Sequence, residues 1–160
     1  MKYFAILTVL VLIVTLVGVG YLYMTSNIVI EAYGVNAVPT ANQPELFNSL
    51  ATQVRLGAVI GTPFVAAQEL SSPENYQFYT YTVRLRNDCA VTADMVELQV
   101  SPMAGDVLQI GNFTEMKLPA GQTADVSATI LTAASMHPIR EVVVTYYVWG
   151  VPFSVKTTVN

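Results

Sequence analysis

The chain has 160 residues, of which 53% are hydrophobic and only 11% are charged, and its formal net charge is -4. Soluble domains usually carry about 25% charged residues, so this charge content is unusually low for one. The basic residues are scattered among acids and form no stripe, which argues against nucleic acid as a partner.

The first part of the chain is an almost unbroken apolar run. Residues 4–24 read FAILTVLVLIVTLVGVGYLYM, and no charged side chain occurs between Lys2 and Glu31. A helix of about 20 residues spans the roughly 30 Å hydrocarbon core of a bilayer. Tyr21 and Tyr23 come at the far end of the run, where aromatic rings favour the interface. The sequence therefore predicts one transmembrane helix, which contacts the lipid bilayer through residues 4–24.

The orientation of this helix follows from charge. Positive charge tends to stay in the cytoplasm, and near the start of the span it comes only from Lys2 and the N-terminus. We expect residues 1–26 to form a cytoplasmic tip and signal-anchor in the cell membrane, and residues 27–160 to form one extracytoplasmic domain. A cleaved signal peptide is the alternative, with Gly18-Val19-Gly20 as its cleavage site. Signal peptides, however, normally have a shorter apolar core, of about 7 to 15 residues.

Beyond the anchor, apolar and polar residues alternate in short runs, as in strands that bury one face. A first strand over 28–35 would follow the anchor almost directly, which places the domain close to the membrane. The clearest later runs are 79–86, 96–101, 123–130 and 151–159. Turn-forming residues separate them at 71–75, 87–88, 119–122 and 149–150. This pattern predicts an all-β, immunoglobulin-like β-sandwich of about 7–8 strands.

One stretch departs from the alternation. Residues 42–45 (NQPE) are typical of a helix start, because a proline stands early and a glutamate follows the asparagine by three residues. Apolar residues then recur at helical spacing over 46–54, and Gly57 can end the helix. We expect one short amphipathic helix over 44–56 that covers one end of the sandwich. An interfacial helix on the nearby membrane is the alternative.

Two segments resemble a known family. Residues 81–87 (YTVRLRN) and 118–123 (LPAGQT) look like parts of the CARDB-type domains, bacterial and archaeal immunoglobulin-like modules related to cell adhesion. In that family a strand ending in Asn leads to a loop, and a later Leu-x-Ala-Gly turn opens the next strand. The resemblance covers residues 77–159 and implies a β-sandwich that serves as a spacer or binding module, with no catalytic residue. Asp88-Cys89 departs from the family, which usually has a small residue and glycine there.

The sequence offers little for catalysis. The only histidine, His137, precedes a strand, and the only cysteine, Cys89, falls in a different loop, so no arrangement of nucleophile and base is apparent. The residues needed for a usual zinc site or a phosphate-binding glycine loop are also missing from the sequence. We therefore expect no enzyme activity and no cofactor.

Two loop features have alternative interpretations. Asp88, Asp94 and Glu97 are close in sequence and could hold calcium, but their spacing matches no EF-hand, and solvated loop acids are the expectation. Asn112-Phe113-Thr114 satisfies the N-glycosylation pattern, which also arises by chance.

Strand alternation leaves four aromatic residues on faces opposite the expected core: Tyr76, Phe78, Tyr147 and Trp149. Exposed aromatic residues often mark binding surfaces, so these four are the expected contacts with a partner. The alternative is that the helix or a neighbouring segment covers both faces of a strand.

The sequence thus predicts a membrane-anchored extracytoplasmic binding or scaffolding module without catalytic activity, with a protein partner at or near the membrane surface. The alternative is a pilin-like or other surface-filament subunit, which also joins an N-terminal hydrophobic helix to a β-rich head. Bacterial pilins usually carry a glutamate early in the mature helix and a basic-glycine processing site before it. Neither appears here, since the first acid is Glu31.

Overall fold

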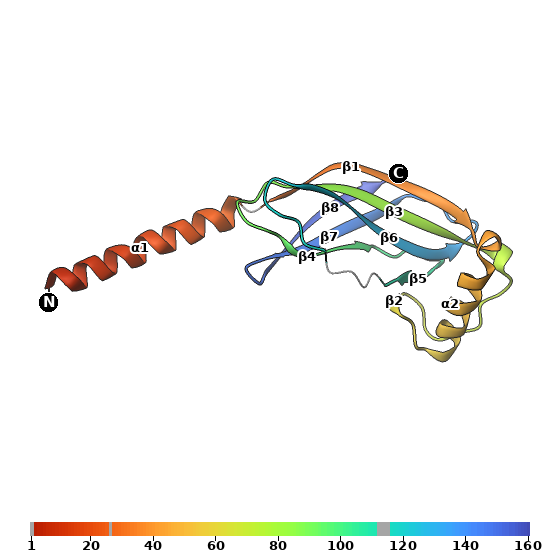
Figure 1. Ribbon diagram of the computed structural model, residues 1–160. Coiled ribbons are helices and arrows are strands. Elements are labelled where there is room, and N and C mark those ends of the chain that lie inside the picture. The colour runs from red at the N-terminus through yellow and green to blue at the C-terminus, as the bar shows by residue number, and fades with distance from the viewer. Residues whose placement is uncertain (1, 26, 112–115) are drawn as a thin grey trace.

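The computed structural model describes residues 2–25, 27–111 and 116–160. Two antiparallel β-sheets pack face to face to form a head, and helix α1 (Lys2–Thr25) projects from one end of it (Figure 1). A second α-helix, α2 (Pro44–Leu56), lies at the opposite end (Figure 1). The expected mostly-β head with one short helix, preceded by an apolar N-terminal helix, is confirmed.

The described part of the chain contains eight strands. The larger sheet has the order β1-β3-β6-β5-β2, and the smaller sheet has the order β4-β7-β8. The larger sheet consists of β1 (Ile28–Pro39), β2 (Gly61–Pro63), β3 (Tyr76–Asn87), β5 (Asp106–Ile110) and β6 (Thr123–Ala133). The smaller sheet consists of β4 (Asp94–Val100), β7 (Arg140–Val148) and β8 (Val151–Val159). Short 3-10 helices, η1 (Thr40–Asn42) and η2 (Pro73–Asn75), precede α2 and β3.

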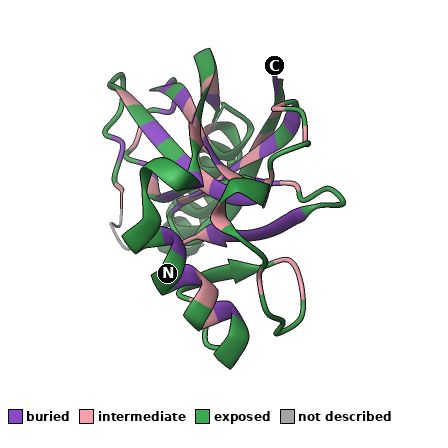
Figure 2. Cartoon of the chain, turned by 90° about the vertical axis from the view of Figure 1, so that its right-hand side faces the viewer, coloured by how far each residue is buried: buried purple, intermediate pink, exposed green. Residues whose placement is uncertain are grey.

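The main core lies between the two sheets and follows the alternation of the sequence. On β3 the inward side chains of Tyr81, Val83 and Leu85 are fully buried. On β7, Val144 and Tyr146 meet them from the other sheet. Figure 2, which views the molecule from the α2 end, shows buried and exposed residues alternating along the strands. The predicted register of both strands is therefore confirmed.

Helix α2 has the predicted bounds, but its start differs in detail. The residue before the first turn is Gln43, which makes no side-chain capping bond, and Asn42 belongs to η1. Asn42, the first residue of the predicted start pattern, therefore does not cap the helix. Pro44 supplies a pre-set φ and lacks the N–H that would go unpaired there. The helix ends at Gly57, whose φ of 66° is the left-handed conformation that glycine adopts easily.

A second apolar cluster lies on the outer face of the larger sheet, where α2 packs. Phe47 and Leu50 of α2 contact this face, and Phe78 of β3 is buried beneath them, only 3% exposed. The expectation that Phe78 contacts a partner is therefore wrong, because α2 covers the second face of β3. The apolar face of α2 is buried against the sheet, and α2 lies at the end of the head opposite α1 (Figure 1), which argues against the interfacial-helix alternative.

Helix α1 is long and apolar enough to cross a membrane, and the head buries none of its apolar span over Tyr3–Thr25. It ends at Thr25, and β1 begins at Ile28. No stalk separates the helix from the head, as the sequence predicts. The end of the head next to α1 is called the anchor end, and the end that carries α2 is called the distal end.

The two apolar clusters predict that residues 27–160 fold without the anchor. A domain of this size buries enough apolar surface to be stable without disulfides. Circular dichroism of this fragment should show mainly strand with a small helical contribution from α2, and thermal unfolding should be cooperative. A mainly helical or non-cooperative profile would contradict the two-sheet head.

Candidate functional site

Aromatic rings join the anchor to the head. The ring of Tyr23, in the last turn of α1, lies 5.1 Å from the ring of Phe153 on β8. Phe153 in turn stacks on Tyr146 of β7 at 5.6 Å and an interplanar angle of 15°. The backbone N–H of Ile28, the first residue of β1, donates a hydrogen bond of 3.3 Å to the Tyr146 hydroxyl. Tyr23 thus packs on the β7–β8 hairpin where the helix meets the head.

The β7–β8 hairpin also lies at the anchor end, and its turn is strained. Its central residues, Trp149 and Gly150, have φ angles of 52° and 78°, and two positive φ angles define a type I′ turn. Such turns normally use Asn, Asp or Gly, because this conformation costs a bulky residue about 1–2 kcal/mol. Trp149 is nevertheless 58% exposed, so burial of its ring within the head does not compensate for the strain.

A second strained residue lies beside this hairpin. Met95 of β4 has a φ of 50° and is 53% exposed. It sits in a β-bulge next to Asp94, which pairs with Tyr147 of β7. Val151, the first residue after the turn, is also exposed. Met95, Trp149 and Val151 are together called the anchor-end patch.

The four aromatic residues expected to contact a partner do not form one surface. Trp149 is in the anchor-end patch, and Tyr147 is half-buried next to it on the outer face of the smaller sheet, so both point out as predicted. Tyr76 and Phe78 instead start β3 at the distal end. Tyr76 is half-buried with its ring 5.6 Å from that of Phe47 on α2. Only the hairpin pair remains as a candidate interaction site.

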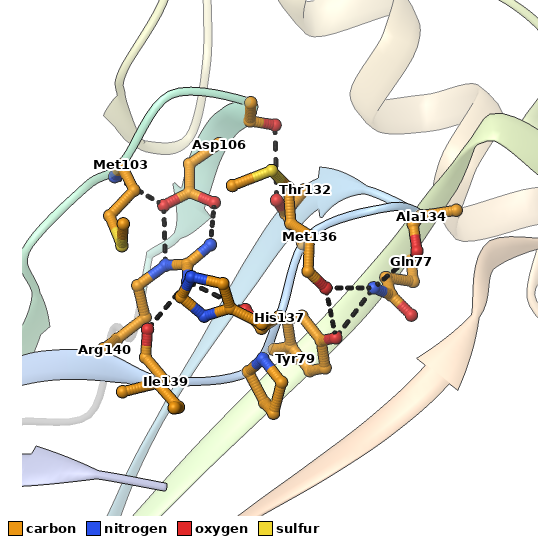
Figure 3. A network of polar contacts seen from close by, with 12 residues as sticks. Gln77, Tyr79, Met103, Asp106, Thr132, Ala134, Met136, His137, Ile139 and Arg140 are labelled. Carbon is orange, nitrogen blue, oxygen red and sulfur yellow. Dashed lines mark hydrogen bonds and ion pairs between the residues drawn. The ribbon is translucent and has the colours of Figure 1, made fainter.

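The distal end holds a buried ion pair that links the two sheets (Figure 3). Arg140 of β7 donates to both carboxylate oxygens of Asp106 on β5, from Nε at 3.0 Å and Nη2 at 2.8 Å, and both side chains are fully buried. Nη1 of Arg140 donates to the carbonyls of His137 and Ile139, each at 2.8 Å. The backbone N–H of Met103 donates to Asp106 at 2.8 Å. The guanidinium and the carboxylate are therefore well supplied with partners.

This network sets the ionisation of its members. Burial alone would raise the pKa of Asp106, but hydrogen bonds from Arg140, Met103 and Thr132 outweigh it and hold that pKa below its usual value. Burial raises the pKa of the nearby Tyr81 to about 12, so its hydroxyl stays protonated. That hydroxyl donates to the carbonyl of Pro138 at 2.7 Å. The network thus ties the turn before β7 to the core, and this role is structural.

The other residues considered for chemistry lie apart. His137 is exposed in the turn before β7, and Cys89 is buried at the anchor end. Among the described residues, no group of three or more His, Cys, Asp or Glu comes together to hold a metal ion. Instead Asp88 pairs with Arg86 at 3.1 Å, and Asp94 pairs with Lys117 at 3.5 Å. Glu97 is exposed on β4. The glycosylation triplet Asn112-Phe113-Thr114 lies outside the described residues.

The two segments behind the family resemblance meet in space. The side chain of Asn87, the last residue of β3, donates to the carbonyl of Leu118 at 2.7 Å. The backbone N–H of Gly121 donates to the carbonyl of Asn87 at 2.8 Å. Asn87 is fully buried, so these bonds hold the loop around Leu118 against the end of β3. The Asn and the later glycine turn are thus parts of one structural corner.

These features define a class of protein: a two-sheet β head carried directly on a single apolar N-terminal helix. Comparison with known proteins adds no family to this description, since no protein-family model matches the chain and no curated protein is significantly similar to it.

The buried pair predicts that Asp106→Asn destabilises the head by about 3–5 kcal/mol, because Arg140 is left charged and buried without a counter-charge. Urea unfolding of the 27–160 fragment measures this loss. Asp125→Asn is the matched control, since Asp125 forms a two-point ion pair of similar geometry with Arg84, at 2.8 and 2.9 Å, on the exposed surface. The control should leave the unfolding midpoint nearly unchanged.

The same pair has a pH signature. Because the pKa of Asp106 is lowered by folding, the stability it contributes is present above about pH 4, the usual pKa of Asp, and is lost as the pH falls through the lower folded value. Asp106→Asn should therefore lose less stability in acid than the unchanged head. An equal loss in both proteins would show that Asp106 is not the group that titrates.

The exposed hairpin predicts that Trp149→Ala changes the stability of the head by no more than about 0.5 kcal/mol, as surface substitutions do. The comparison is Tyr146→Ala on the inward face of the same hairpin, which should cost about 3–5 kcal/mol. Differential scanning calorimetry of both variants measures the contrast. A large loss for Trp149→Ala would mean that its ring stabilises the head.

Proposed function

We propose that this chain is a membrane-anchored binding or scaffolding module, with an immunoglobulin-like head outside the cytoplasm and no catalytic activity. The direct joint between anchor and head is the observation that carries this proposal. Tyr23 packs on Phe153, and Ile28 bonds to Tyr146 only three residues after α1 ends at Thr25. A head fixed to its anchor in this way keeps one orientation relative to the membrane. One surface always faces the membrane and another always faces away, which suits a scaffold.

The proposed contact site of this module is the hairpin region with Tyr147 and Trp149, together with the rest of the anchor-end patch. Apolar side chains exposed together are costly in water, and they mark surfaces that bind. The site lies next to α1, so its partner is at the membrane surface. The polar groups of the distal end, by contrast, are engaged in the network around Asp106 and Arg140, where they support the fold.

A surface-filament subunit is the second candidate, and two observations favour it. Most apolar side chains of α1 are exposed, so they could pack against copies of the helix as well as against lipid. The 12-residue strand β1 is an edge of the larger sheet, and such edges can pair with another chain. Electron microscopy of sheared surface material separates the candidates: filaments that contain this chain would favour the second.

The proposed topology predicts the outcome of protease treatment. Protease added to spheroplasts should remove the head, residues 27–160, and leave the α1 segment protected in the membrane. Alkaline carbonate should fail to extract the full-length chain. Cleavage of the head only after lysis would show that the head lies in the cytoplasm. A mature N-terminus near Tyr21 would instead identify a cleaved, secreted protein.

A further inference from the structure

We propose that the anchor-end patch inserts into the interface of the same bilayer that holds α1, so that the head is attached to the membrane at two points. This inference rests on the proposed function, because it names the partner of the exposed hairpin site as lipid. It is carried by three observations: the position of the patch, its composition, and the backbone strain in it.

The position follows from the aromatic joint. Phe153, which contacts Tyr23 near the end of α1, is three residues beyond Gly150 of the hairpin turn. A strand advances about 3.3 Å per residue, so the turn reaches about 10 Å past this contact. In Figure 1 the β7–β8 turn lies at the α1 side of the head, and these strands run in roughly the direction of α1. Trp149 therefore lies beside the last turns of α1, at the level where a spanning helix meets the headgroups.

The composition of the patch suits that level. Tryptophan is enriched at membrane interfaces, because its ring is apolar while its indole N–H needs a polar partner. Trp149 is exposed at the tip of the hairpin, with Val151 and Met95 exposed beside it. Tyr21 and Tyr23 of α1 are also exposed and add aromatic rings on the helix side. Exposed tryptophan and tyrosine rings are typical of the headgroup region.

Backbone strain is the independent observation. Among the described residues, Met95 and Trp149 are the two non-glycine residues with positive φ, and both belong to this patch. Asn or Gly at position 149 would form the same turn with less strain. A turn facing water would gain nothing from a strained Trp, whereas a turn at the interface gains the transfer of the ring out of water. The strain thus supports a contact with lipid.

The charges near the patch point to an apolar attachment. Lys117 is paired with Asp94, and Arg86 is paired with Glu31 and Asp88. Acids and bases neutralise one another here, so the described anchor end offers no basic cluster that would require anionic lipid. Insertion should therefore occur into zwitterionic phosphatidylcholine and should be insensitive to salt.

Trp149 is the only tryptophan of the chain, so its intrinsic fluorescence reports on the patch alone. The experiment uses the full-length chain in phosphatidylcholine vesicles, with and without lipids that carry a spin label at a shallow acyl position. An interfacial ring lies about 5–10 Å deep, near these labels, so about a twofold loss of Trp149 emission is expected. Iodide in the aqueous phase should quench the emission little, and 0.5 M NaCl, roughly a threefold rise over physiological ionic strength, should change neither result.

The matched control moves the reporter away from the membrane. The double variant Trp149→Phe/Tyr33→Trp places the only tryptophan on β1, where Tyr33 is exposed five residues beyond Ile28. This reporter should be quenched by iodide and not by the labelled lipid. Equal lipid quenching of both reporters would show a head lying against or collapsed onto the bilayer, and would overturn a contact specific to the patch.

Other outcomes separate this inference from the function on which it rests. Vesicle flotation tests the anchor: a chain that does not float with the vesicles refutes the membrane-anchored module, and the inference with it. A chain that floats but keeps Trp149 open to iodide overturns only the inference. If Trp149 is then shielded from iodide in native membranes alone, the partner of the patch is a protein.

Discussion

The direct connection between α1 and β1 is the constraint on which the rest of the structure depends. Since β1 begins three residues after α1 ends at Thr25, the end of the head where β1 starts must lie against the end of the helix. Antiparallel pairing then assigns every turn to one end or the other. The β7–β8 turn falls at the anchor end, and α2 falls at the distal end (Figure 1). Which residues could meet a membrane is therefore a consequence of strand order.

The two ends of the head differ in how their apolar and charged side chains are covered. At the distal end, the larger sheet has a second apolar face, which α2 covers, and the start of β7 is tied to β5 by the Arg140–Asp106 pair. The cost of burying these charges is offset because each of their side-chain nitrogen and oxygen atoms has a hydrogen-bond partner. At the anchor end Tyr23 of the helix packs on Phe153 of β8. Apolar side chains next to that joint remain exposed, and lipid is the solvent in which their exposure is least costly.

Much of the fold could be predicted from local patterns. Period-two alternation identified the inward faces of β3 and β7, and helical spacing with Gly57 at its end gave the bounds of α2. The fate of Phe78 could not be predicted in this way. Alternation shows that it lies opposite Tyr79 and Tyr81, but the packing of α2 onto that face depends on contacts between segments about 30 residues apart, as between Phe47 and Phe78. The helix begins at the predicted residue, but Asn42 does not cap it, because Asn42 belongs to η1.

The sequence by itself determined the apolar span of residues 4–24, the strand periodicity and the outward direction of Tyr147 and Trp149, because each depends only on neighbouring residues. Tertiary structure decided which outward residues stay exposed: Phe78 is covered, whereas Trp149 is not. It also brought together Asp106 with Arg140 and Tyr23 with Phe153, pairs that are 34 and 130 positions apart in the numbering. Such pairs form only when the sheets close on each other, since no local preference links residues that distant.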